Sequence, residues 1–235
     1  SQPDLVLQAE VLPLAVAPML QRAQTGIQWG GDLRVSALID IRAGERFDAE
    51  VAVRRHDGDL LVVENGRSQP LGLTDVELSL SAHDGVWLVK PLFAGSTLGT
   101  ISGAVTVRTT PQRRWPAPDA PIEGAVQVQV PDLGVWARWV PPGWRLAGEL
   151  SSTAGVGGRF GAPEYTGELR GSGIAVRNLL QGLEFSDGDL LIALKGDRAE
   201  IERMSIRGGD GTLTAEGQAT FGSAPGAQLK VTAQR

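Results

Sequence analysis

The sequence predicts an all-β protein, a long antiparallel or mixed sheet of about sixteen short strands with two short helices. Apolar and polar residues alternate at a period of two along most of the chain, as they do in half-buried strands. Turn signals that combine Gly with Asp or Asn recur about every 8–12 residues, which is typical of hairpins and meanders. Residues 212–221 give the clearest example, because every second position is apolar or Gly and the others are Thr, Glu or Gln.

Length and composition exclude several classes of function. The 235 residues suffice for one large domain or two smaller ones with a sizeable core. Because 27 Asp and Glu outnumber 22 Lys and Arg, the net charge is −5, which disfavours nucleic-acid binding. The Arg113-Arg114 pair beside Trp115 is too short to supply a basic patch. The absence of cysteine excludes disulfides, thiolate metal sites and a cysteine nucleophile.

No segment has the length of a membrane span. The longest apolar run, residues 11–20, is interrupted by Pro13 and Pro18 and is far shorter than the ~20 residues that cross a bilayer. No signal peptide precedes the first expected strand, and the chain begins within the alternating pattern. We therefore expect the sequence to be a piece of a longer protein.

The expected elements follow from these patterns in order. Residues 14–24, which end before Gly26, favour a short helix, and Asp132 can cap a second helix that places Leu133, Trp136 and Val140 on one stripe. Residues 109–121 contain four prolines and are expected to form a loop. The strands are expected at residues 5–11, 33–41, 47–54, 60–63, 76–82, 86–92, 101–108, 122–130, 146–150, 156–160, 165–171, 190–195, 199–206, 212–221 and 229–233.

An internal repeat divides the chain. The segment from Leu73 to Ile101 matches the segment from Phe185 to Leu213 at an offset of 112 residues without a gap. Upstream, Gly31-Asp-Leu matches Gly148-Glu-Leu at a slightly larger offset. We therefore expect two divergent copies, residues 1–110 and 122–235, joined by a proline-rich boundary loop at 111–121 and sharing one continuous sheet.

Six glycines lie in register with apolar residues instead of with polar ones. Glycine inside a strand permits sharp curvature or the close approach of another object. The pattern predicts a strongly curved sheet whose concave side is not filled by side chains alone, and the alternative is a curved sandwich with layers of small residues. These glycines are Gly103, Gly124, Gly148, Gly167, Gly171 and Gly217.

Chemistry-bearing residues are sparse. His56 and His83 both precede Asp-Gly and are expected to be solvated turn residues. The segment 155–161 lacks the Lys and Ser/Thr of a phosphate-binding loop, and 208–213 resembles a single turn of a calcium-binding repeat, which needs tandem copies. We expect no catalytic residue, no metal and no cofactor, and hence no enzyme.

The tryptophans are expected to lie at one end of the sheet. Trp136, Trp139 and Trp144, with Trp115, form the densest aromatic group of the sequence. They are interpreted either as a plug that covers the end of the sheet or as an amphipathic lip at its edge. Trp suits apolar surfaces that are partly exposed to water.

Several motifs resemble the TamB family, the AsmA-like proteins of the translocation and assembly module. Residues 155–170, with their Gly, Pro-Glu-Tyr-Thr-Gly and Leu spacing, are similar to a recurring signature of that family. Residues 182–190 and 201–217 resemble its following steps, and 132–150 resembles its short helix before a new strand. The resemblance is clearest over residues 120–222 and weaker over 1–110.

The resemblance implies a U-shaped, taco-like sheet with an apolar concave face that conducts phospholipid acyl chains in the periplasm. It implies a protein anchored in the bacterial inner membrane by a helix outside this sequence, and a partner that is an Omp85-type outer-membrane barrel (TamA-like) contacting regions outside it. Acyl chains gain roughly 0.8 kcal/mol for each buried CH₂, so a contiguous trough holds them without specific bonds. The expected lipid-facing residues are Val35, Ile39, Val76, Leu78, Leu80, Ile101, Val105, Val107, Ile122, Val126, Val128, Leu146, Leu150, Leu169, Leu190, Ile192, Leu194, Leu213, Ala215 and Phe221.

The alternative function is that of a β-rich adhesin or structural scaffold domain of a secreted or autotransporter-like protein. Such proteins share Gly-rich short strands, but their rungs are usually ~20–25 residues long. The much longer repeat and the helical inserts disfavour this alternative.

Overall fold

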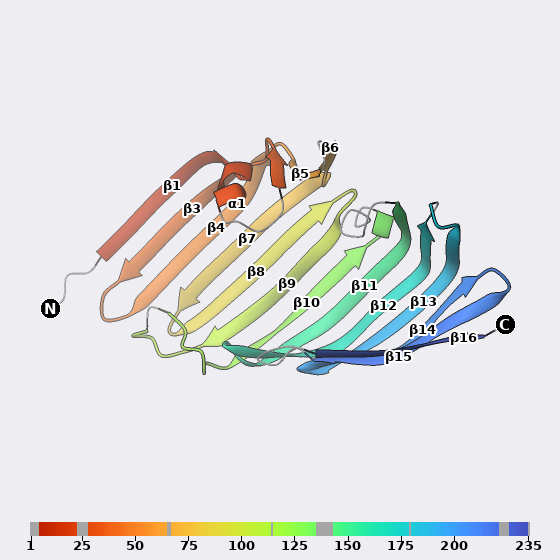
Figure 1. Ribbon diagram of the computed structural model, residues 1–235. Coiled ribbons are helices and arrows are strands. Elements are labelled where there is room, and N and C mark those ends of the chain that lie inside the picture. The colour runs from red at the N-terminus through yellow and green to blue at the C-terminus, as the bar shows by residue number, and fades with distance from the viewer. Residues whose placement is uncertain are drawn as a thin grey trace. The chain divides into compact units, whose positions relative to one another are not determined.

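The computed structural model describes residues 5–22, 28–64, 67–113, 115–134, 143–178, 180–220 and 226–234. Strands dominate these residues, and the one α-helix among them, α1 (Ala17–Arg22), is short. The prediction of an all-β protein is therefore confirmed (Figure 1). The chain forms two compact units, residues 1–124 with 159–161 and residues 125–158 with 162–235.

The first unit holds an antiparallel main sheet and a smaller second sheet. The main strands lie in the order β1-β3-β4-β7-β8-β9, and the small sheet has the order β2-β5-β6. The bounds are β1 Leu5–Ala15, β2 Gln28–Gly31, β3 Arg34–Ala43, β4 Phe47–Asp57, β5 Leu60–Glu64, β6 Arg67–Pro70, β7 Leu73–His83, β8 Val86–Gly95 and β9 Gly99–Arg108.

The second unit is a longer-stranded meander in the order β10-β11-β12-β13-β14-β15-β16, and the pairs from β12 to β16 are antiparallel. The bounds are β10 Ile122–Val130, β11 Trp144–Arg159, β12 Ala162–Asn178, β13 Leu183–Gly196, β14 Arg198–Gly208, β15 Gly211–Thr220 and β16 Gly226–Gln234.

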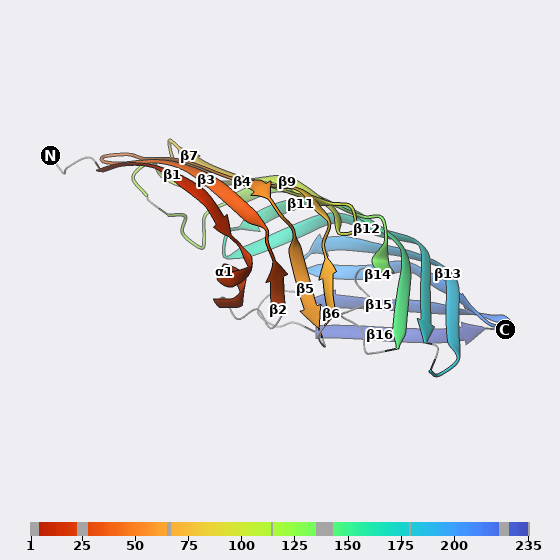
Figure 2. The ribbon, with the colours of Figure 1, turned by 90° about the horizontal axis from the view of Figure 1, so that it is seen from above.

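Three segments of the first unit pass directly from one sheet to the other. β2 leads into β3 through Asp32-Leu33, β4 leads into β5 through Gly58-Asp59, and β6 leads into β7 through Leu71-Gly72. Since β2-β5-β6 and β3-β4-β7 have the same order, the small sheet continues three main-sheet strands. It turns away from the main sheet along a line through these residues, which we call the first crease (Figure 2).

Asp59 fastens the first crease. Its carboxylate accepts hydrogen bonds from the backbone N–H groups of Leu60 (2.8 Å), Gly72 (2.9 Å) and Leu73 (3.0 Å). Its own backbone N–H donates to Oδ1 of Asp32 at 3.0 Å. These bonds replace the ladder hydrogen bonds that the crease interrupts, so the backbone groups there are satisfied.

A small hydrophobic core fills the inside of the first crease. Its buried members come from α1, the crease and β7, and partly buried residues of the small and main sheets pack against them. The core therefore joins the small sheet and α1 to the apolar side of the main sheet. The buried residues are Ala17, Leu33, Leu60, Leu73 and Val76, and those packed against them include Trp29, Val35, Phe93 and Leu98.

The strands of the second unit bend without leaving their sheet. The register of β12 against β13 shifts between Gly171 and Ile174, and that of β13 against β14 shifts between Ser186 and Asp189. Gly148 of β11 lies against the same bend of β12. We call this line, through Gly148, 173–174 and 187–188, the second crease. Figure 2 shows the ends of β11, β12 and β13 turning out of the plane of the other strands.

The strand positions follow the spacing of the internal repeat. β8 begins at Val86 and β14 at Arg198, and β9 begins at Gly99 and β15 at Gly211, so each pair begins 112 residues apart. Gly31 and Gly148, the matching glycines upstream, both lie at a crease and both have positive φ, +101° and +117°. The repeat is therefore a three-strand meander that follows a crease.

Two predicted elements differ from the structure. β1 continues through Leu14, which pairs with Val35 of β3, so the helix begins only at Ala17. The strands expected at 146–150 and 156–160 are one strand, β11, because residues 151–155 between them continue the strand.

The second predicted helix lies mostly outside the described residues. Oδ1 of Asp132 accepts a hydrogen bond from the backbone N–H of Gly134 at 2.7 Å, as an N-cap residue does. Residues 135–142, which include Trp136 and Trp139, are not among those described, so this helix stays a prediction.

Candidate functional site

One face of the first unit is apolar across five adjacent strands. Ile39 of β3 pairs with Val51 of β4, and the same rung continues through Leu80 of β7, Val89 of β8 and Val105 of β9. We call this side of the main sheet the first apolar face. The neighbouring rungs are Ala37, Val53, Leu78 and Pro91 on one side, and Ile41, Ala49, Ala82, Trp87 and Val107 on the other.

The second unit carries a matching set of rungs, which we call the second apolar face. Leu169 of β12 pairs with Ile192 of β13, followed by Ile201, Gly217 and Leu229 of the next three strands. The adjacent rung consists of smaller residues, Gly167, Leu194, Ala199, Ala219 and Ala227. On β16, Leu229 and Val231 are 64% and 57% exposed.

Neither face is the core of a closed sandwich. In a sandwich, two sheets interdigitate and bury large side chains to crystal-like density. Among the described residues, no large side chain is less than 2% exposed, and the central rung of the first face, from Ile39 to Val105, is half-buried throughout. The two faces are therefore partly open apolar surfaces.

An aromatic cluster ends the first apolar face at the strand ends away from the crease. Trp87 stacks on Phe47 with ring centroids 5.6 Å apart, and the edge of Trp115 meets Trp87 at 5.2 Å. The proline-rich segment 109–121 is held there, since the backbone N–H of Phe47 donates to the carbonyl of Pro111 at 3.0 Å. We call Phe47, Trp87 and Trp115 the aromatic rim, and Trp115 is 65% exposed.

The structure groups most of the predicted groove residues by unit. Eight of them lie on the apolar side of the first unit: Val35, Ile39, Val76, Leu78, Leu80, Ile101, Val105 and Val107. In the second unit the ladders place Leu169, Leu190, Ile192, Leu194, Leu213 and Ala215 on one side. Half-buried positions of β10 and β11 that alternate with exposed ones are Ile122, Val126, Val128, Leu146 and Leu150.

The aromatic predictions have a different outcome. Trp144 is half-buried at the start of β11, beyond the second crease. Phe221, Trp136 and Trp139 lie outside the described residues, so their predicted roles stay predictions.

The predicted groove set omits several residues that belong to the first apolar face. Val51, Val53 and Val89 lie in its middle, and Phe47 and Trp87 lie at its aromatic rim. The signal was present in the sequence, because the strands expected at 47–54 and 86–92 place all five at alternating positions.

The glycines on the apolar faces mark curvature, and their missing side chains do not leave open space. A Cβ on Gly148 would lie 2.8 Å from Cα of Ile174, and one on Gly124 would lie 2.7 Å from Cα of Val105. At Gly217 the obstacle is the carbonyl oxygen of Gln228 on the neighbouring strand. Adjacent backbones thus occupy the positions that side chains would need, which supports the curvature interpretation.

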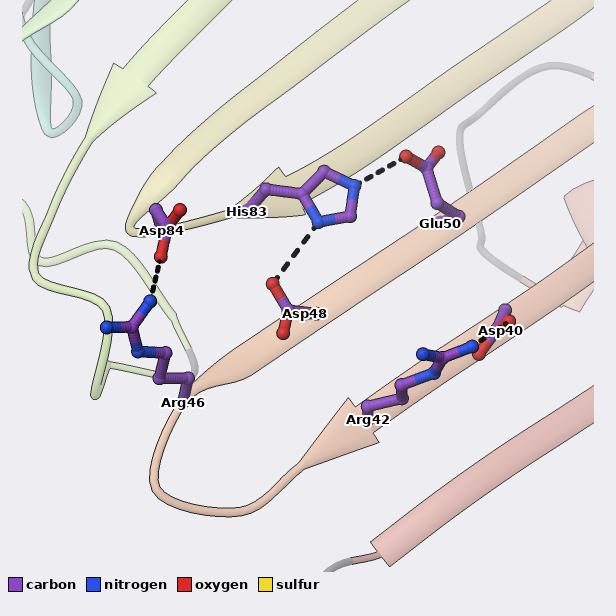
Figure 3. Close-up of polar contacts among 7 residues, drawn as sticks. All are labelled: Asp40, Arg42, Arg46, Asp48, Glu50, His83 and Asp84. Carbon is purple, nitrogen blue, oxygen red and sulfur yellow. Dashed lines mark hydrogen bonds and ion pairs between the residues drawn. The ribbon is translucent and has the colours of Figure 1, made fainter.

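A histidine bridges two carboxylates on the polar side of the first unit (Figure 3). Nε2 of His83 lies 2.6 Å from Oε1 of Glu50, and Nδ1 lies 3.2 Å from Oδ1 of Asp48. The hydrogen bonds to Glu50 and then Asp48 raise the pKa of His83 above its ordinary value. His83 is exposed at the turn between β7 and β8, as predicted, and the pairing of β4 with β7 adds the two carboxylate partners that the sequence did not indicate.

A second ion pair lies beside the first crease. Nε of Arg34 donates to Oδ1 of Asp57 at 2.7 Å, and Nη2 of Arg34 contacts the other carboxylate oxygen. The hydrogen bond from Arg34 lowers the pKa of Asp57. Both side chains are about half exposed, so the pair contributes little to stability and mainly fixes the strand ends that enter the crease.

Clusters of ligands for a metal are absent from the part of the chain that the structure describes, where no group of three or more His, Asp and Glu could hold an ion. The helix found among these residues is too short to cross a membrane.

The fold and the face together define a class: an antiparallel meander in repeated units, each creased and each with one partly open apolar face. A family model described as TamB, N-terminal domain, matches residues 11–170. This match covers more than half of the chain, and the chain belongs to the TamB family. It includes most of the first unit, where the sequence motifs are weaker. No curated protein and no solved structure matches the chain.

Membership of this family associates the chain with the translocation and assembly module and with the cell envelope.

Proposed function

We propose that this chain is a non-enzymatic groove segment that shields acyl chains and conducts phospholipids through the periplasm between the inner and outer membranes. In this role it serves lipid homeostasis of the outer membrane and the assembly of outer-membrane proteins. The anchor in the inner membrane and the contact with an Omp85-type, TamA-like barrel lie in other parts of the protein.

One observation carries the proposal: each unit presents an unbroken apolar rung, from Ile39 to Val105 in the first and from Leu169 to Leu229 in the second, whose residues are half-buried or exposed instead of packed shut. The rung from Ile39 to Val105 crosses five strands, or about 19 Å at the spacing of neighbouring strands. Acyl chains lying across such rungs gain roughly 0.8 kcal/mol per buried CH₂ without any directional bond. Many similar weak sites of this kind suit movement along the face better than one tight site.

The side chains also suit a binding role better than catalysis. The described histidine with a shifted pKa, His83, is hydrogen-bonded to Asp48 and Glu50 on the polar side of the sheet, opposite the side that carries the apolar rungs. The apolar rungs themselves carry no titratable residue. The proposal therefore assigns no reaction to this chain.

Native mass spectrometry of the chain purified after export to the periplasm of bacterial cells tests the proposal. We expect phospholipid adducts that organic solvent extracts from the purified protein. The matched pair of variants is Leu80→Arg on the apolar face and Ser81→Arg at the next position of β7, on the polar face. Leu80→Arg should remove most of the adducts and Ser81→Arg should keep them. A folded protein free of lipid in all three forms would contradict the proposal.

A further inference from the structure

The apolar rung nearest the aromatic rim is covered in the first unit. All of its residues except Ile41 are at most 5% exposed. Ala120 of the proline-rich segment belongs to the same buried cluster, and Trp115 of that segment rests its edge on Trp87. The segment therefore lies over this rung and ends the open part of the first apolar face. The rung consists of Ile41, Ala49, Ala82, Trp87 and Val107.

We call the described parts of this segment, 109–113 and 115–121, the cover. Backbone hydrogen bonds fix it at both ends. The N–H of Thr109 donates to the carbonyl of Gly85 at 2.7 Å, and the N–H of Gly161 donates to the carbonyl of Pro118 at 2.7 Å. Trp115 lies between these two points, and it is 65% exposed. Its ring therefore forms the exposed edge of the cover.

A cation bounds the open part of the first apolar face at its other end, beside the first crease. Arg55 pairs with Val35 and lies two positions along β4 from Val53, so it is on the apolar side of the sheet. Its Nε and Nη2 donate to the carbonyl of Gly58 at 3.2 Å and 2.7 Å. An acyl chain that covered this guanidinium would remove a charge from water, which is costly. The apolar strip therefore ends at Arg55.

The open part is a strip two rungs wide that runs across the strands. On β7, Val76 is buried in the crease core and Ala82 lies under the cover, so Leu78 and Leu80 remain half-buried between them. Residues on one side of a strand repeat about every 6.8 Å, which makes the strip about 14 Å wide. Hydrocarbon chains in contact lie about 4–5 Å apart, so about two or three chains fit abreast. Four chains on one head group would leave part of their length in water.

The corresponding rung of the second unit is uncovered. At the repeat offset of 112 residues, the residues of β7, β8 and β9 in the covered rung have the counterparts Leu194, Ala199 and Ala219. These three pair with one another in one rung, and all three are half-buried. After β15 the described chain resumes as β16, which pairs with β15 and extends the sheet instead of covering it. The second apolar face is therefore wider than the strip of the first.

We propose that the cover, through Trp115 on Trp87, limits the first apolar face to lipids with two acyl chains, whereas the second apolar face also accepts lipids with four. The inference rests on the proposed function and adds which lipids each unit accepts. Trp87 positions Trp115 and closes the rung, and Ala199 leaves the same position of the second unit open. This position is thus a determinant of lipid selectivity.

Photo-crosslinking in the purified full chain tests this inference. A photoreactive residue at Val51 reports on the first apolar face, and one at Ile192 reports on the second. The two lipids are phosphatidylglycerol, which has two acyl chains, and cardiolipin, which has four of the same chains and the same number of phosphates per chain. We expect comparable labelling by both lipids at Ile192. At Val51 we expect about tenfold less labelling by cardiolipin, which corresponds to about two CH₂ groups left in water.

Two variants change the selectivity in opposite directions. Trp115→Ala removes an exposed ring and should raise cardiolipin labelling at Val51 about fourfold, the equivalent of about one further sheltered CH₂ group. Ala199→Trp should lower cardiolipin labelling at Ile192 about tenfold and keep that by phosphatidylglycerol. The control Gln218→Trp adds the same ring on the polar side of β15 and should leave both lipids unchanged.

The remaining outcomes separate the inference from the proposed function. Equal labelling by both lipids at Val51 in the wild type would overturn the inference and leave the proposed function standing. Labelling by neither lipid at either position would overturn both. An equal loss of cardiolipin labelling in Ala199→Trp and Gln218→Trp would show an effect of added bulk alone and overturn the inference.

Discussion

At the first crease the main sheet is interrupted and Asp59 bonds the two sides, whereas at the second crease the strands stay in one sheet and bend at glycines. The interrupted sheet needs a hydrophobic core to hold its small sheet in place. The bent sheet keeps most of its ladder and needs backbone conformations that favour glycine, such as φ +117° at Gly148. Both units thus have the same order of strand, crease and meander. Side chains hold the crease together in the first unit, whereas backbone conformation forms it in the second.

The same contrast extends to the apolar faces. At the repeat offset of 112 residues, Trp87 corresponds to Ala199, and Val107 corresponds to Ala219. Trp87 and Val107 are 5% and 3% exposed under the aromatic rim, whereas Ala199 and Ala219 are half-buried. The first face is therefore closed at both ends by side chains, and the second is lined by smaller residues.

The largest expected effect is the loss of the aromatic rim. Trp87→Ala removes a buried ring that contacts Phe47 and Trp115, and it should lower the free energy of unfolding by about 3–5 kcal/mol. The counterpart Ala199→Trp should cost less than about 1 kcal/mol, because overpacking penalties arise only in closed cores. Urea unfolding followed by circular dichroism measures both. A cost above about 2 kcal/mol for Ala199→Trp would mean that the second face is closed.

Next in size is the loss of the Asp59 carboxylate at the first crease. Asp59→Ala leaves the N–H groups of Leu60, Gly72 and Leu73 without their acceptor, and we expect a loss of about 2–3 kcal/mol. Hydrogen exchange of the backbone amides should become faster in the small sheet and in α1. Asp187→Ala at the second crease is the matched control, since its exposed carboxylate lies 3.6 Å from Arg207 and should contribute less than about 1 kcal/mol. Equal losses in the free energy of unfolding for the two variants would contradict the claim that a carboxylate fastens only the first crease.

A smaller effect is expected from a methyl group at the second crease. Gly148→Ala forces an L residue into φ +117° and against Ile174, which should cost about 1–3 kcal/mol. Gly157→Ala in the same strand is the control, because nothing lies within 4 Å of its added Cβ, and it should change stability by less than about 1 kcal/mol. Thermal unfolding of the two variants gives the comparison. If both behave alike, the crease does not depend on the glycine backbone.

The smallest effect is the pH dependence of the His83 bridge. Because Glu50 and Asp48 raise the pKa of His83 in the folded state, the bridge stabilises the fold fully below the unfolded pKa of about 6.5. The contribution, less than about 1 kcal/mol for this half-exposed side chain, is lost as the pH rises through the raised folded pKa. The free energy of unfolding, measured between pH 5 and pH 9, should show this loss in the wild type. The loss should be absent in His83→Gln. An unchanged pH profile in the variant would contradict the assignment.

The alternating pattern is enough to predict the class of fold, the meander and the repeat, because one face of each strand is apolar. The creases are not predictable from that pattern. Asp59 reads as an ordinary turn residue in Asp57-Gly-Asp, and its role emerges only when β6 and β7 bring Gly72 and Leu73 beside it. The same holds for His83, whose partners lie 33 and 35 residues away in the sequence.

The apolar faces are predictable residue by residue where alternation is regular, as along β7, but less so near the bulges of β13 and β14. The glycines illustrate the limit. Their register with apolar residues is visible in the sequence, but whether a neighbouring backbone or an open space replaces the side chain depends on strand twist, which the one-dimensional pattern does not contain.

Site-specific photo-crosslinking to phospholipid in living cells tests the central claim most directly. A photoreactive residue is placed at Leu80 or Leu213 on the apolar faces, and at Ser81 or Glu216 on the polar sides. We predict lipid adducts at Leu80 and Leu213 and none at Ser81 and Glu216. Equal labelling of both sides, or labelling of neither, would contradict the claim that the apolar faces carry lipid.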